Sequence, residues 1–397
     1  MTWMDVLLLV LSLPVVLACG YLLLLTLLSA NLPTPPRVAP RLRFDIIVPA
    51  HNEEAGIART VRNLLALDYP AELRRVLVVA DNCSDTTAER ARDAGATVLV
   101  RYDTEKRGKG FALAHAFEHS LKDGFADAVV VVDADTEVSP HLLHSFGLRL
   151  EAGAQAIQAH YGVLNPNDSW RTRLMAIGMA LFHKVRSQGR ERLEVSCGLR
   201  GNGMCFSHRV IREVPHDAFS IVEDLEYGIR LGRAGHRVHY AWEAEVLGEM
   251  VSSEKASRSQ RRRWEGGRWA MTKQFGVPLL DEALEKRNPV LLDLAMDLLV
   301  PPLSYVVLGA LAVAGAAGAL SVWQDRVAFS AYAAAFCVAS LGLYVFRGWW
   351  VSGMGVQGLL ALARAPFYVV WKVWLMAVGP RDKKGEWVRT TREARKP

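Results

Sequence analysis

Several familiar chemical signatures are missing from this chain of 397 residues. Its five cysteines have neither the spacing of metal ligands nor that of a disulfide framework, so a zinc module and a disulfide-rich secreted scaffold are excluded. The region 44–150 holds no G-x-G-x-x-G and no G-x-x-x-x-G-K-[ST] motif, so dinucleotide and P-loop sites lose their usual support. The cysteines fit the role of small apolar fillers in a reducing compartment.

Charge is also missing from residues 6–28, an apolar run that is long enough to cross a bilayer. We expect residues 1–31 to form a transmembrane helix, which Pro14 would kink. A cleaved signal peptide is the alternative. The run is too long for one, no basic residue precedes it, and no small-residue cleavage site follows clearly. Residues 32–43 form a proline-rich linker with three arginines, so the positive-inside rule predicts a cytosolic location for the chain that follows.

The carboxyl third contains further apolar runs. We predict an interfacial segment at 271–289, two transmembrane helices within 290–347, and an interfacial helix at 348–380, where Arg364 and Lys372 lie among aromatic residues. A third crossing in place of this last helix is the alternative. The basic tail 381–397 should be cytosolic. The net charge of +6 then matches a surface facing the anionic lipids of a bacterial inner membrane, and it requires no nucleic acid.

Residues 44–150 alternate strand and helix patterns with short connections, which predicts a doubly wound parallel α/β sheet. Strands are expected at 44–48, 76–79, 98–100 and 128–132, and helices at 53–67, 85–94, 110–121 and after Pro140. Polar residues gather where three of these strands end, at 49–54, 80–85 and 133–135. In an open α/β sheet such ends meet at one edge, and ligands bind there.

Four consecutive valines lead directly to Asp133 and Asp135, a pattern typical of a strand that is buried on both faces and ends in acids. Two carboxylates held so close repel unless a cation lies near them, and oxygen ligands suit Mg²⁺ or Mn²⁺. For this triplet alone, a helix N-cap with a solvated partner is the simpler alternative. The three polar clusters together favour a nucleotide and metal site.

Individually modest motifs occur in order along residues 44–270. They are Pro49-x-x-Asn52-Glu53, the loop with Asp81, Arg107-Gly-Lys-Gly110, Asp133-Ala-Asp135, Glu223-Asp224 and Gln260-Arg-Arg-Arg-Trp264. Jointly they resemble the motifs of family 2 glycosyltransferases, which are inverting enzymes. Membrane members with the last motif include cellulose, hyaluronan and chitooligosaccharide synthases and lipid glycosyltransferases. The resemblance implies an α/β fold with a cytosolic GT-A (doubly wound, Rossmann-like) domain at 44–270, plus transmembrane and interfacial α-helices.

The resemblance also implies roles for individual residues. Glu53 and Asp81 would hold the uridine base and ribose, and Lys109 would approach the nucleotide. Asp133 would contact the nucleotide sugar, and Asp135 would ligate the Mg²⁺ or Mn²⁺ that bridges the two phosphates. The other residues expected at the nucleotide-sugar site are Pro49, His51, Ala134, Gln260, Arg263 and Trp264.

Asp224 is the candidate general base by its match to the family's motif. A sugar hydroxyl is a poor nucleophile until a carboxylate takes its proton. Glu223 would orient the site. The simpler alternative for both is a helix amino terminus, which favours acidic residues. Lys109 has a similar alternative as a helix-start lysine that faces water.

Gln260, Arg263 and Trp264 share one helical face by their i, i+3 and i+4 spacing. A guanidinium there would grip a diphosphate and an indole would stack on a sugar ring. A solvated basic face is the alternative for this charge run. Residues 196–205 are rich in glycine and resemble the family's acceptor-side segment, with a plain turn as the alternative.

We therefore expect a metal-dependent hexosyl- or N-acetylhexosaminyltransferase. It would move a sugar from a UDP-sugar to a hydroxyl of a growing polysaccharide or a membrane lipid. One alternative is a membrane nucleotidyltransferase, but the first polar loop offers no glycine-rich triphosphate site. Another is a transport or scaffold protein with a degenerate domain, whose mark would be the loss of Asp135 or Asp224; both are present. Whether the protein forms a homo-oligomer is left open.

Overall fold

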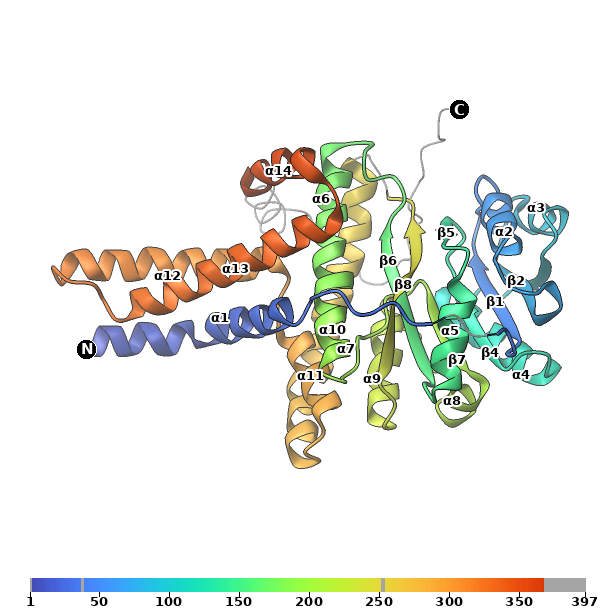
Figure 1. Cartoon of the computed structure of the whole chain (residues 1–397), viewed down its shortest axis with the longest axis horizontal. Helices are drawn as coiled ribbons and strands as arrows, with labels where there is room; N and C mark the ends of the chain where they lie inside the picture. Colours follow the sequence, from blue (N-terminus) through green and yellow to red (C-terminus); the bar gives the residue numbers. More distant parts are fainter. Residues whose placement is uncertain (1, 37–38, 251–253, 368–397) are drawn as a thin grey trace.

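The computed structural model describes residues 2–36, 39–250 and 254–367, without the side chains of residues 254–263. Figure 1 shows a mixed sheet with helices at one end of the molecule and a narrow bundle of long helices at the other. Further helices lie between these two parts. Within the described residues the strands form a single sheet in the order β3-β2-β1-β4-β7-β6-β8-β5.

One half of the sheet is parallel. Its strands, in spatial order, are β3 (Thr97–Arg101), β2 (Arg74–Asp81), β1 (Phe44–Ala50) and β4 (Ala128–Val131). The connecting helices are α2 (Ile57–Leu65), α3 (Thr87–Asp93) and α4 (Lys109–Asp123), with a short η1 (Ala71–Leu73) before β2. The alternation that the sequence predicts over residues 44–132 is therefore present, with element ends shifted by a few residues.

The other half of the sheet is mixed and is built mainly from strands beyond residue 150, for which the sequence analysis predicted no strand directions. Strand β7 (Met204–Ser207) runs antiparallel to both β4 and β6 (Ala156–Val163), and β8 (Val238–Gly248) runs parallel to β6. The edge strand β5 (Thr136–Val138) is antiparallel to β8. The helices of this half are α5 (Leu142–Glu151), α8 (His208–Glu213) and α9 (Glu223–Arg233).

The strands at the centre of the sheet are buried on both faces. Alternate residues of β1 enter different hydrophobic clusters: Ile46 and Val48 lie on one face and Ile47 on the other. Val129 and Val130 of β4 divide in the same way. Such two-sided burial explains the unbroken apolar runs of the sequence. It also fixes the carboxyl ends of β1, β2 and β4 at one edge of the sheet, where the polar loops begin.

Three helices in the described part of the chain are long and apolar enough to cross a membrane: α1 (Trp3–Leu27), α12 (Leu303–Trp323) and α13 (Ser330–Ser352). They pack together as the bundle seen in Figure 1, with α1 in contact with both others. The ends of α1 and α13 nearest the sheet are Leu27 and Ser352. The bundle therefore meets the sheet-containing part of the chain at this end.

The segments around these spans differ from the sequence-based boundaries. Helix α10 (Glu254–Glu285) runs across residue 270, and the apolar run that begins at residue 290 is split between α11 (Pro289–Leu299) and α12 by Pro301 and Pro302. Proline removes a backbone donor and ends the first helix there. The expected interfacial helix at 348–380 begins as the end of α13 and α14 (Gly355–Ala363). Residues 368–397, with the basic tail, lie outside the described residues.

A buried ion cluster joins α7 to helices α1 and α11. Arg190 lies in α7 (Arg186–Arg192), which continues α6 (Trp170–Met179) through the π-helical turn η2 (Ala180–Val185). Its fully buried guanidinium lies 3.2 Å from Asp293 Oδ2 and 2.7 Å from Asp297 Oδ1, both in α11, and it donates to the Tyr21 hydroxyl of α1 at 2.7 Å. Removing one partner from such a buried pair costs about 3–5 kcal/mol.

The contact between α7 and α1 yields a prediction. A Cβ on Gly189 would lie 2.7 Å from the carbonyl oxygen and 2.9 Å from the Cα of Leu25. Because backbone cannot yield as a side chain does, Gly189→Ala should lower the free energy of unfolding by about 1–3 kcal/mol. Gly178→Ala on α6 meets nothing within 4 Å and should be neutral or stabilising, since alanine favours helix. Thermal unfolding in detergent compares the two; equal midpoints would contradict this packing.

Candidate active site

Two polar loops are tied together at the carboxyl edge of the sheet. The His51 ring, just after β1, hydrogen-bonds through Nδ1 to the carbonyl oxygen of Asp81 at 2.8 Å. The backbone N–H of Glu53 donates to Thr87 Oγ1 at 2.7 Å. These bonds fix the first loop, which starts at Pro49, against the second. The Asp81 carboxylate, which is almost fully buried, accepts from Arg101 Nη1 at 2.6 Å.

Lys109 lies at the centre of the candidate site. It is the first residue of α4 and follows Gly108, whose φ of 120° suits glycine. Its Nζ lies 2.5 Å from Asp133 Oδ1, donates to the carbonyl oxygen of Gly201 at 2.5 Å, and is 3.9 Å from Glu223 Oε1. The lysine therefore faces its partners rather than water. It brings three segments that are far apart in the sequence to one point.

Asp133 and its neighbours leave β4 along a fixed path. The backbone N–H of Asp133 donates to Asn202 Oδ1 at 3.1 Å, and Asn202 Nδ2 donates to Thr136 Oγ1 at 2.8 Å. The carbonyl oxygen of Ala134 accepts from a threonine hydroxyl of α2 at 2.8 Å. Asp135 is half-buried in the turn between β4 and β5. The aspartate pair is thus held by a buried asparagine from the glycine-rich segment.

Glu223 and Asp224 begin helix α9, next to this segment. Gly201 has a φ of 75°, and a Cβ there would lie 3.4 Å from Asp224 Oδ2 and 3.7 Å from Lys109 Nζ. The Gly201 backbone therefore passes directly beside both side chains. Glycine is favoured here by the left-handed backbone conformation, whereas a Cβ would make only ordinary van der Waals contacts. Asp133, Lys109, Glu223 and Asp224 converge around this residue.

Burial has the largest single effect on the pKa of each of these groups. It raises the pKa of Glu223 to about 7, against the opposing effect of Lys109 and with added repulsion from Asp224. It also raises the pKa of Asp224. Burial lowers the pKa of the Lys109 ammonium, but Asp133 and Glu223 outweigh it and raise that pKa overall. A carboxylate with a raised pKa is a stronger base near neutral pH, which is the property that a general base needs.

The donor set fits a hard divalent cation held jointly with a substrate. Among the described residues, no group of three or more His, Cys, Asp or Glu side chains is arranged to hold a metal ion. Asp133 and Asp135 nevertheless offer carboxylate oxygens at the sheet edge. Mg²⁺ is commonly bound by one or two carboxylates together with substrate phosphates and water, not by an all-protein cage. A site of this kind is compatible with the residues present.

The remaining predicted residues are placed only in part. Gln260 and Arg263 belong to α10, but their side chains lie outside the described part of the chain. Trp264 packs on an apolar cluster with Val163 and Met179, between the sheet and α6. The predicted grip of Arg263 on a diphosphate and the stacking of Trp264 on a sugar therefore stay predictions.

Sequence reasoning missed two residues of the site. Arg101 pairs with Asp81 and is the last residue of β3. Its position at the carboxyl end of a parallel strand is the sequence feature that could have indicated its place in the site. Asn202 is fully buried and bonds to the Asp133 backbone, inside a segment in which only the glycines were noted. Its role depends on the antiparallel entry of β7, which local patterns did not reveal.

Comparison with known proteins identifies the family of this chain. Residues 40–267 match a family model described as glycosyltransferase like family 2. The chain belongs to this family. The resemblance to family 2 glycosyltransferases that the motifs indicated is thereby confirmed.

Curated relatives support the same assignment. A probable glycosyltransferase, YdaM, from Bacillus subtilis is 24% identical over 261 residues, which are 64% of this chain and 60% of the relative. A beta-monoglucosyldiacylglycerol synthase from Trichormus variabilis is 30% identical over 230 residues, covering 56% of this chain and 48% of that protein. The chain thus matches about half the length of these relatives.

A solved structure shares the fold. The mannosyltransferase PcManGT from Pyrobaculum calidifontis, in complex with GDP-Man and Mn²⁺, superposes with a TM-score of 0.51 at 19% identity. The match covers 93% of this chain and 98% of that one. The expected GT-A fold with additional membrane helices is confirmed.

The acid pair yields a prediction for transferase activity. If Asp224 is the base, activity should fall as pH drops through the pKa of Asp224, which burial raises. The acid limb of kcat/KM should therefore lie above the pH range in which an ordinary aspartate titrates. Glu223→Gln removes the neighbouring negative charge and should move this limb to lower pH. Glu118→Gln, a matched change at an exposed position on α4, should leave it in place. A limb near pH 4 in the unmodified protein would contradict the assignment.

Proposed function

We propose that this protein is an inverting glycosyltransferase that moves a sugar from a UDP-sugar to a hydroxyl of a membrane-associated acceptor. The supporting observation is the convergence of Asp133, Lys109, Glu223 and Asp224 around the Gly201 backbone. These groups lie at the carboxyl edge of the sheet, where α/β enzymes bind nucleotides.

Asp224 acts as the general base. It accepts the proton of the acceptor hydroxyl as the new glycosidic bond forms, and its raised pKa strengthens it for this task. Glu223 sets the local charge beside it. Lys109 holds Asp133 and the Gly201 carbonyl in place, so that the base and the nucleotide-sugar loop keep a fixed separation.

The leaving group is a nucleoside diphosphate, so a second carboxylic acid is not required. Asp135 would hold the Mg²⁺ or Mn²⁺, which supplies charge neutralisation for the departing diphosphate when bound, and Asp133 would contact the nucleotide sugar. Lys109 contributes an ammonium at the same edge of the sheet. Arg263 would add a guanidinium from α10 if that helix presents it to the site.

Glu53 and Asp81 lie in the loops that would receive the nucleoside. Their loops are tied together by the His51 hydrogen bond, which creates one continuous wall after β1 and β2. We assign uridine as the base, by resemblance to the family. The fold neighbour that binds GDP-Man makes guanosine the base to test beside it.

The acceptor is a polysaccharide or a lipid at the membrane surface. Three helices of the described chain are able to cross a membrane, and one relative is named as a glucosyldiacylglycerol synthase. We infer a cytosolic catalytic side and helices in a bacterial inner membrane; the arginines at positions 37, 41 and 43 support this orientation by the positive-inside rule.

Removal of the base provides the first test. Asp224→Asn keeps the shape of the side chain but cannot accept the proton, so kcat should fall by about 10²–10⁴-fold while nucleotide affinity is largely kept. Asp93→Asn, at an exposed position on α3, should have no effect. Sugar transfer by the purified protein in vesicles measures kcat, and calorimetry measures UDP binding. Undiminished turnover by Asp224→Asn would remove this residue as the base.

Metal dependence provides the second test. Chelation with EDTA should abolish release of UDP from a panel of UDP-sugars, and Mn²⁺ should restore it. Asp135→Asn should raise the Mn²⁺ concentration needed for half-maximal activity, because one ligand is lost. GDP-Man is included in the panel. Full activity in EDTA would refute the metal assignment, and release of GDP alone would refute uridine. Formation of UTP and sugar 1-phosphate from a UDP-sugar after pyrophosphate is added would point to a nucleotidyltransferase.

A further inference from the structure

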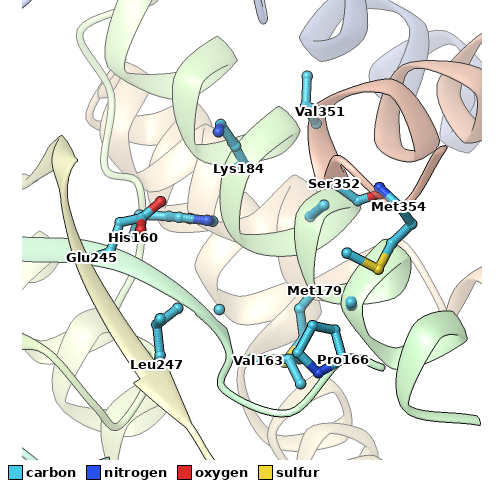
Figure 2. A pocket seen from close by; sticks show the side chains of 13 residues that line it. His160, Val163, Pro166, Met179, Lys184, Glu245, Leu247, Val351, Ser352 and Met354 are labelled. Carbon is cyan, nitrogen blue, oxygen red and sulfur yellow. The ribbon is translucent and has the colours of Figure 1, made fainter. Parts of the chain in front are cut away.

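A pocket lies where the catalytic sheet meets the membrane helices. Its volume is about 150 Å³, and it opens between strands β6 and β8, helix α6 with η2, and the junction of α13 and α14 (Figure 2). In Figure 2, His160 and Glu245 of the sheet lie on one side, and Val351, Ser352 and Met354 lie on the other. The pocket is therefore shared by the soluble and membrane parts of the chain.

The polar wall results from an irregularity in the sheet. Strands β6 and β8 are in register up to Ala159, and the register then shifts so that His160 pairs with Glu245. Such a shift re-aims side chains, and irregular pairings of this kind are common next to functional sites. His160 and Glu245 consequently face the pocket, together with Lys184 from η2.

The charges of this wall cancel. Lys184 carries a positive charge and Glu245 a negative one. Burial lowers the pKa of His160 to about 3, with further lowering from Lys184, so its imidazole is neutral. Its Nδ1 is engaged with the Tyr240 hydroxyl at 3.0 Å. A wall with one donor cation, one acceptor anion and no net charge complements hydroxyl groups rather than a phosphate.

The rest of the lining is apolar and continues into the membrane bundle. Val163 and Met179 belong to the cluster that also holds Trp264 of α10. Val351 and Met354 pack on the cluster formed inside the bundle of α1, α12 and α13. The apolar lining of the pocket therefore borders the apolar core of the bundle. Methionine side chains adapt readily to apolar ligands.

The lining also argues against a polysaccharide. Sugar rings are usually gripped by stacking on aromatic side chains, and no Trp, Tyr or Phe lines this pocket among the residues that the structure describes. The pocket combines apolar walls with one cation and one anion whose charges cancel. This combination fits an uncharged lipid with a hydroxyl-bearing head.

The pocket is connected to the candidate active site through strand β6. His160 follows Ala159, whose N–H donates to the carbonyl oxygen of Gly203 at 2.8 Å. Gly203 lies two residues beyond Gly201, which borders Asp224 and Lys109. Strand β6 and the glycine-rich segment therefore connect the pocket wall to the proposed base.

We propose that this pocket binds a neutral, hydroxyl-bearing membrane lipid as the acceptor of the sugar. The proposal rests on the proposed transferase function and narrows its acceptor to a lipid. Lys184 and Glu245 hold the head group, the methionines and valines hold the start of the acyl chains, and the free hydroxyl is presented toward Asp224.

Binding can be tested without catalysis. The full chain in phosphatidylcholine vesicles is cross-linked with a photoactivatable diacylglycerol, the simplest lipid of this class. Label should fall on peptides of residues 160–184 or 351–354 and be competed by unlabelled diacylglycerol. Ala176→Trp fills the pocket and should abolish this label, whereas Ala335→Trp, exposed on α13, should not. Label confined to other segments, or label unchanged in Ala176→Trp, would overturn the proposal.

Kinetics separate this proposal from the transferase assignment. Lys184→Gln and Glu245→Gln should each raise the KM for diacylglycerol by about threefold to tenfold and leave the donor KM unchanged, as expected for one lost hydrogen bond. Lys122→Gln, at an exposed position on α4, is the control. An unchanged acceptor KM in both variants, or a soluble oligosaccharide that competes away the cross-link, contradicts the lipid site. Specific cross-linking without sugar transfer contradicts the proposed function instead and leaves the lipid pocket standing.

Discussion

The ammonium group of Lys109 is the interaction on which the candidate site depends. It contacts the Asp133 carboxylate and the Gly201 carbonyl, and it lies 3.9 Å from Glu223. Without this cation, the enclosed carboxylates around Gly201 would repel one another and take up protons. A lysine at the start of α4 therefore keeps the loop after β4, the glycine-rich segment and the start of α9 in one arrangement, with the base beside the expected sugar phosphate.

A single buried cation also organises the contact between α7 and helices α1 and α11. Arg190 bridges the two aspartates of α11 and the Tyr21 hydroxyl of α1, and the neighbouring Gly189 allows the α1 backbone to pass close by. Helix α7 continues from η2, which contributes Lys184 to the pocket. One helical rod thus fixes the first membrane helix and also forms part of the proposed acceptor site. These contacts fix α7 against α1 and α11.

Much of this arrangement was readable in the sequence because local patterns encode it. The valine run ending in Asp133 determined a buried strand and its polar exit. The helix amino terminus that was the simpler alternative for Glu223 and Asp224 is also present, as the start of α9. Non-local pairing was not readable. Strand β7 is short and enters antiparallel, so neither the mixed half of the sheet nor the bond from Asn202 to Asp133 could be foreseen. The division of the run after residue 290 was signalled by Pro301 and Pro302, but the apolar length concealed it.

A structure of the protein with UDP-sugar and Mn²⁺ bound in a lipid bilayer tests the central claim most directly. The account predicts density for the diphosphate and its metal against Asp135, with the anomeric carbon of the sugar facing Asp224 and leaving room for an acceptor hydroxyl within hydrogen-bond reach of that carboxylate. A nucleotide bound away from Asp135, or a sugar in a cavity that Asp224 does not line, would contradict it.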